Sequence, residues 1–220
     1  MIALTRFRIA AYVRSHRAFQ PLIGLLILLA ILHGARIPAG AELGAMADSA
    51  AILIPVFAWA ARGLLDSEPD EQRMISITAV GRREAVAGIV AAWIFNAGLA
   101  AISFAALASR LSDRPEVAAV LAGVGLHLLA ILAGTTLGAL TSRPILGSPA
   151  ASTLTLLLGY LAVLLLSLSG QPWLTVPVMT WMREAHHGEL LAHFPAVAAW
   201  SLLWPVLGLA AYARLRRSRP

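Results

Sequence analysis

Six long apolar stretches dominate this chain of 220 residues, and short segments rich in proline, glycine and charge separate them. A helix needs roughly 20 mostly apolar residues to cross the ~30 Å hydrocarbon core of a membrane. The stretches, of which the first is the shortest, are residues 19–33, 46–65, 85–108, 117–140, 150–168 and 194–215. The pattern predicts an all-α integral membrane protein, a single transmembrane domain over residues 1–220 with six transmembrane helices.

Composition agrees with this prediction and excludes several other classes of protein. Hydrophobic residues make up 59% of the chain and charged residues 13%, whereas a soluble domain is about 25% charged. Disordered chains are poor in apolar residues, so disorder is excluded as well. The chain contains neither cysteine nor lysine. It therefore offers no disulfide, no thiolate metal site, no Walker-A lysine and no Schiff-base chemistry.

The positions of the arginines predict how the spans are oriented. If both termini are cytoplasmic, thirteen arginines lie on that side and four on the other: Arg36, Arg110, Arg114 and Arg183. Positive residues favour the cytoplasmic side, so six spans with both termini inside is the consistent arrangement. The alternative is that the chain up to residues 39–41 (Ala-Gly-Ala) is a cleaved signal peptide. Removal of that segment would leave five spans, and the arginines would then no longer fall mainly on the cytoplasmic side of the membrane.

The first eighteen residues are interpreted as an interfacial helix that lies on the cytoplasmic leaflet before the first span. Leu4, Phe7 and Ala11 follow one another at helical spacing, and four arginines surround them. Such a helix buries its apolar side among the lipids while its positive charges meet the headgroups. A merely basic tail that sets the topology is the alternative.

The segment 66–84, between the second and third spans, is acidic at its start. Four of the chain's eleven acidic residues fall within positions 66–71. Ser67 is expected to cap a helix that has Pro69 in its first turn, and Gly81 is expected to end it. That helix would carry three apolar residues: Met74, Ile75 and Ile77. A solvated connector needs neither the cap nor the apolar residues, so a docking element for another protein is the preferred interpretation.

The segment 169–193 is apolar at first but broken by prolines, and too short to cross. Trp173 and Trp181 suit a membrane–water boundary, and a polar patch precedes Pro195, which is expected to open the sixth span. We therefore expect a re-entrant or interfacial helical hairpin on the outer side. The adjacent histidines 186–187 do not indicate a metal site, because neighbouring side chains point different ways on a helix.

Three polar residues in or beside the spans are candidates for a substrate path: His127, Asn96 and Asp48. Ionisable groups at membrane depth are costly and face protein or a watery cavity. A hydrogen bond to a neighbouring helix is the favoured role for both Asn96 and His127, and the lining of a substrate path is the alternative role for His127. Three glycines in the fourth span predict tight helix packing: Gly123, Gly134 and Gly138.

Taken together, these features resemble the membrane subunit of ABC exporters of the ABC-2 type, which have the type V fold. The shared features are the basic N-terminal helix, six spans with both ends inside, an acidic helix after the second span, and an outer hairpin after the fifth. Locally, residues 66–73 followed by Gly81-Arg82 look like the coupling helix of small permeases from actinobacterial drug and natural-product exporters. The lysine-free, alanine- and arginine-rich composition fits a high-GC genome of that kind.

The resemblance implies a partner and a mechanism. Two six-helix subunits, as a homodimer, would form the translocation unit in the bacterial plasma membrane and export a hydrophobic small molecule, an antibiotic or a short peptide. A separate ATP-binding subunit would hold the ATP and Mg²⁺, because this chain has no GxxxxGK[ST] motif. The chain itself is then no enzyme, has no cofactor and binds no nucleic acid. The coupling residues would be Asp66, Glu68, Pro69, Asp70, Glu71, Gln72 and Arg73.

Other functions stay open at this point. A haem-exporter permease of cytochrome c maturation has the same size and span count. The substrate-binding membrane subunit of a vitamin importer is less consistent with an acidic segment at 66–73. An intramembrane enzyme would need clustered acids or histidines at one depth, and the spans supply few.

Overall fold

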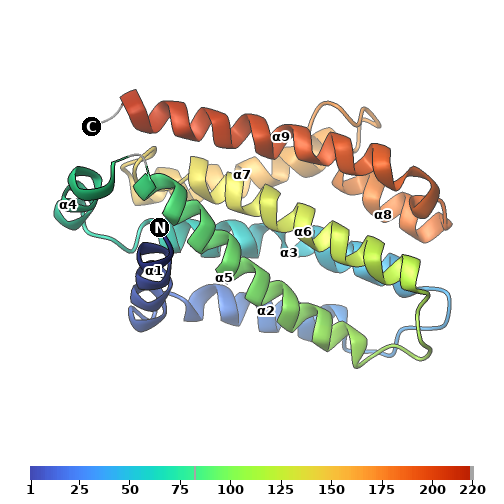
Figure 1. The fold of residues 1–220 in the computed structure, drawn as a ribbon. Helices are drawn as coiled ribbons and strands as arrows, with labels where there is room; N and C mark the ends of the chain where they lie inside the picture. Colours follow the sequence, from blue (N-terminus) through green and yellow to red (C-terminus); the bar gives the residue numbers. More distant parts are fainter. Residues whose placement is uncertain (82, 219–220) are drawn as a thin grey trace.

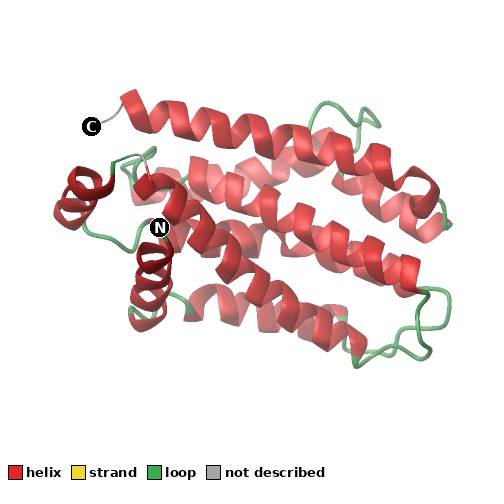
Figure 2. Ribbon diagram, viewed as in Figure 1, coloured by secondary structure: helices red, strands yellow, loops and turns green. Residues whose placement is uncertain are grey.

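The computed structural model describes residues 1–81 and 83–218, without the side chains of Asp70, Arg217 and Ser218. Within these residues the chain forms nine α-helices, and the one β-type feature is an isolated bridge between two loops (Figures 1 and 2). The helices are α1 (Ile2–Arg14), α2 (Phe19–Leu32), α3 (Glu42–Leu65), α4 (Asp70–Val80), α5 (Arg83–Ala108), α6 (Val117–Leu140), α7 (Pro149–Ser167), α8 (Val178–His187) and α9 (Leu190–Ser218).

Long helices run side by side as one bundle, and the short ones lie at its two ends (Figure 1). Both termini, α1 and α4 share one end, which we call the α4 end. Helix α8 and the loops after α2 and α5 lie at the opposite end, called here the α8 end.

Five of the helices are long and apolar enough to cross a membrane: α3, α5, α6, α7 and α9. The predicted first span corresponds to α2, whose 14 residues reach only about 21 Å as a helix. Helix α1 meets α2 at an angle of 75°, and only if the two are taken together does the number of candidate spans rise to six. The predicted all-helical architecture is thus confirmed, with five helices long and apolar enough to cross a membrane, while the sixth crossing stays a prediction.

Helix α3 is the centre of the bundle, because 67% of its apolar segment is buried against 17% in α7 and in α9. Its neighbour α6 approaches it closely where two glycines face it. A Cβ added at Gly134 would lie 2.6 Å from Phe57 Cβ, and one at Gly138 would lie 2.9 Å from Ala61 Cβ. The expected tight packing of the fourth span is therefore confirmed at these two positions.

The segment after α7 differs from the predicted helical hairpin. Residues 169–177 form turns, and α8 is the one helix before α9 begins. Helix α9 begins at Leu190, so Pro195 lies inside this helix and does not open it. Trp181 is completely buried and its indole N–H donates to Ser201 Oγ at 2.9 Å, so its ring packs inside the protein and does not face lipid headgroups. Trp173 is exposed.

Candidate functional site at the α4 end

The turn between α3 and α4 has a different capping residue from the one predicted. Pro69 occupies the N-cap of α4, and Ser67 instead donates its hydroxyl to Leu64 O at 2.7 Å at the end of α3. Pro69 suits this position because its ring fixes φ and it has no N–H to satisfy. Gly81 ends α4 at a φ of +60°, a region that favours glycine, so its predicted role is confirmed.

Helix α4 presents apolar side chains outward and contributes none to the buried core. Met74, Ile75, Ile77 and Val80 are 52%, 68%, 38% and 40% exposed. The helix packs against α5 and projects beyond the ends of the long helices (Figure 1). Grouped exposed apolar residues on a short helix are typical of a surface that binds another molecule.

The remaining predicted coupling residues are divided between this surface and the interior. Glu71 and Gln72 are exposed, and Arg73 is half-buried. The side chain of Asp70 and all of Arg82 lie outside the described residues.

Glu68 points inward and belongs to a buried cluster of charges. Its Oε2 accepts from Arg8 Nη2 at 2.5 Å and its Oε1 from Ser76 Oγ at 2.8 Å. Arg8 also pairs with the carboxylate of Glu84, whose second oxygen lies 2.8 Å from Arg216 Nη2. The cluster joins α1, the turn before α4, α5 and α9. All four charged side chains are at most 10% exposed.

Sequence reasoning missed three members of this cluster: Arg8, Glu84 and Arg216. All three lie in segments rich in arginine, where a solvated charge is the usual outcome, and Glu84 and Arg216 are also close to helix ends. Of the three, only Glu84 could be suspected of forming an ion pair from the sequence, because it is an acid that directly follows two arginines at the start of an apolar span. Neither the pairing of helices nor the burial of α1 can be read from that signal.

Asp66 connects the end of α3 to the loop after α6. Its Oδ1 accepts from the backbone N–H of Arg143 at 2.6 Å, and its Oδ2 lies 3.7 Å from Arg62 Nε. Its backbone carbonyl accepts from Arg17 Nη1 at 2.9 Å. Burial raises the pKa of the Asp66 carboxyl above its ordinary value of 3.8, although the Arg143 N–H and the nearby arginines act in the opposite direction.

Asn96 is completely buried and holds three helices together. Its amide nitrogen on α5 donates to Phe57 O of α3 at 3.0 Å and to Thr135 Oγ1 of α6 at 3.1 Å. The interhelical hydrogen bond favoured from the sequence is therefore observed. A role in a substrate path stays a prediction.

His127 is buried in α6 beside Phe104 of α5. Its Nδ1 lies 2.9 Å from Gly123 O one turn earlier, and the two rings meet edge to face at 5.2 Å. Its Nε2 has no hydrogen-bond partner among the described residues. His127 thus retains one polar atom for another molecule, which keeps the substrate-path prediction open for it.

Asp48 lies far from the α4 surface, in the early turns of α3 at the α8 end. Its Oδ2 is 3.0 Å from Nε2 of His186 on α8. The His186 ring packs over Gly44, where an added Cβ would lie 2.8 Å from its Nδ1. Within residues 1–81 and 83–218, no three His, Cys, Asp or Glu side chains are grouped as a metal site requires.

The chain was also compared with known proteins. Neither protein-family models, nor curated proteins, nor solved structures gave a match.

Proposed function

We propose that this chain is the membrane subunit of an ATP-driven exporter and that α4 is its docking helix for a separate ATP-binding subunit. The observation that supports this most is the exposure of the apolar side chains of α4, with Ile75 68% exposed. An apolar surface of this kind gains free energy when a partner's groove covers it. The acidic Glu71 in the first turn of α4 would set the orientation of such a complex.

The buried charge cluster would carry force from α4 to the other helices of the bundle. Closure of the ATP-binding subunits would push on α4, whose Ser76 bonds to Glu68. Glu68 is linked through Arg8 to Glu84 on α5, and Glu84 to Arg216 on α9. Because buried ion pairs resist separation, movement of α4 would displace α1, α5 and α9 together.

A second copy of the chain would complete the translocation unit. Helix α7 carries exposed leucines along one side, among them Leu154, Leu161 and Leu165 at 58%, 48% and 59%. Lipid or a second subunit can cover such a face. The cargo proposed is a hydrophobic small molecule, an antibiotic or a short peptide, and the membrane is the bacterial plasma membrane.

The test is capture of an ATP-binding subunit by the tagged full-length chain. The probe is an ATPase with Walker motifs encoded beside this chain, co-expressed and purified in mild detergent. Ile75→Ser and Glu71→Ala should reduce the captured ATPase several-fold while the yield of the chain itself is unchanged. Val117→Ser is the matched control, because Val117 is 75% exposed but begins α6 at the opposite end. Equal capture by all variants would refute the docking role of α4.

A further inference from the structure

A cavity of about 200 Å³ lies at the α4 end, where α1, the start of α2 and the last turns of α3 meet. Six side chains line it: Tyr12, Arg17, Gln20, Trp59, Arg62 and Asp66. None belongs to the α4 surface or to the charge cluster around Arg8. The cavity is therefore a separate feature, and the exporter proposal gives it no role.

Tyr12 supplies a polar atom that lacks a partner. The side chain is completely buried, with its ring edge-on to Phe95 at 5.1 Å between centroids. Its hydroxyl rests against Gly63, where an added Cβ would lie 2.9 Å from the oxygen. Among the described residues nothing accepts or donates a hydrogen bond at this hydroxyl. Buried hydroxyls nearly always have a hydrogen-bond partner. The Tyr12 hydroxyl therefore needs a partner that the residues lining this cavity do not supply.

Two guanidinium groups give the cavity an excess of positive charge. Arg17 uses Nη1 for the Asp66 carbonyl, and Arg62 uses Nε for the Asp66 carboxylate. That carboxylate also accepts from the backbone of Arg143, outside the cavity lining. With two arginines against one carboxylate, the lining suits an anion, and guanidinium N–H groups bind phosphate oxygens in pairs.

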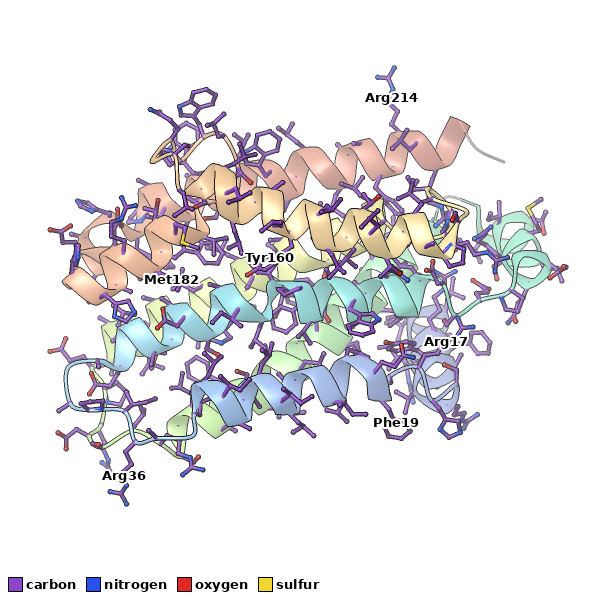
Figure 3. The ribbon with its side chains drawn as sticks, turned by 180° about the vertical axis from the view of Figure 1, so that it is seen from behind. Arg17, Phe19, Arg36, Tyr160, Met182 and Arg214 are labelled. Atoms are coloured by element: carbon purple, nitrogen blue, oxygen red, sulfur yellow. The ribbon has the colours of Figure 1, made fainter. Side chains whose placement is uncertain are left out.

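The position of the cavity indicates where such an anion comes from. Trp59, 45% exposed, is six residues before the end of α3, and Phe19, 53% exposed, begins α2. Figure 3 shows Arg17 and Phe19 together where α2 begins. Exposed aromatic rings at the end of an apolar helix mark the level of lipid headgroups, and basic pockets at that level bind anionic ones.

We propose that this cavity binds the phosphate group of an anionic ligand, with the headgroup of a membrane phospholipid as the source that its position favours. Arg17 and Arg62 pair with the phosphate oxygens, and the Tyr12 hydroxyl donates a third hydrogen bond. Gln20 lies at the first turn of α2, where the helix dipole adds positive potential. Bound there, the headgroup would join α1 to α3.

The experiment measures retention of phosphatidylglycerol by the purified full-length protein, using native mass spectrometry. Phosphatidylcholine at the same concentration is the zwitterionic comparison. The double variant Arg17→Gln/Arg62→Gln should retain at least ten-fold less phosphatidylglycerol. Tyr12→Phe, which keeps the ring against Phe95, should lower retention about five-fold, as expected for one hydrogen bond. Arg14→Gln is the matched control, because Arg14 is an exposed arginine at the end of α1 and does not line the cavity.

A second arm distinguishes the source of the phosphate. Inorganic phosphate at millimolar concentration is added to the lipid-loaded protein. If phosphatidylglycerol stays bound, the ligand is a lipid; if phosphate displaces it and raises the melting temperature by itself, the ligand is a soluble phosphate. Both results support a phosphate site. Equal retention by the double variant and by Arg14→Gln, or no preference for phosphatidylglycerol over phosphatidylcholine, would overturn it. The melting temperature of Tyr12→Phe confirms that the variant is folded.

Discussion

The guanidinium of Arg216, in the last turns of α9, lies 2.8 Å from Oε2 of Glu84 at the start of α5. The other oxygen of Glu84 pairs with Arg8 of α1. One carboxylate therefore pairs with two arginines from opposite ends of the chain, and Glu68 supplies the second negative charge of the cluster. Because water is excluded from all three groups, the carboxylate holds both terminal helices at the α4 end.

Replacing Glu84 should destabilise the protein strongly. Glu84→Gln leaves two buried guanidinium groups with one remaining carboxylate, Glu68, and should lower the free energy of unfolding by about 3 kcal/mol. Denaturant unfolding in detergent, followed by tryptophan fluorescence, measures the loss. Glu116→Gln removes an exposed carboxylate and should change stability by less than about 0.5 kcal/mol. A loss in Glu84→Gln no larger than in this control would contradict the cluster's stabilising role.

The hydrogen bond between Asn96 and Thr135 should be measurable as a coupling. In a double-mutant cycle of Asn96→Ala and Thr135→Val, the interaction energy should be about 0.6 kcal/mol, the average for such bonds within membrane proteins. Asn96→Ala alone should lower the free energy of unfolding by more than this interaction energy, since the amide of Asn96 also donates to the Phe57 carbonyl. Strictly additive losses in the cycle would show that the two side chains do not interact.

Close packing of α6 on α3 predicts opposite effects at two glycines. Gly134→Ala should cost about 2 kcal/mol, because the new methyl group would meet Phe57 Cβ and Ile54 O within 2.8 Å. Gly98→Ala on α5 is the matched control, since nothing lies within 4 Å of its added Cβ. Alanine there should be neutral or stabilise by up to about 1 kcal/mol through helix propensity. Similar melting temperatures for both variants would contradict this packing.

Asp66 predicts a dependence of stability on pH. Burial places its pKa in the folded protein above the ordinary value of 3.8, so the folded state holds the proton more tightly than the unfolded state. The contribution of Asp66 to the free energy of unfolding therefore falls as pH rises from about 4 through the folded pKa. Asp66→Asn removes this titration and should gain stability relative to the wild type over that range. Parallel stability curves for the two proteins between pH 4 and 7 would refute the raised pKa.

Hydropathy alone located the long helices, because a membrane-spanning segment needs only length and apolar composition. The predicted stretch 117–140 coincides with α6, and the stretch 85–108 ends with α5 at Ala108. Boundaries at prolines were less accurate. Pro195 lies inside α9, where the helix continues through the residue that was expected to begin it.

Tertiary contacts account for what the sequence could not predict. Arg8 follows Phe7 in a basic segment, yet it lies inside the protein because Glu68 and Glu84 come from distant parts of the chain. Trp181 was predicted to lie at the membrane–water boundary, whereas its indole N–H donates to Ser201 Oγ inside the protein. In both cases the deciding partner is remote in sequence, so local pattern contains no information about it.

The isolated bridge at the α8 end restricts how this bundle can deform. Ile37, after α2, donates its N–H to Arg110 O at 2.9 Å, and its carbonyl accepts from the Ser112 N–H at 3.1 Å. The loop between α2 and α3 is thereby fastened to the loop between α5 and α6. Helices on either side of this fastening can pivot about it but cannot part there while both bonds hold. While these bonds hold, a gap between these helices would open more easily toward the α4 end than at the bridge.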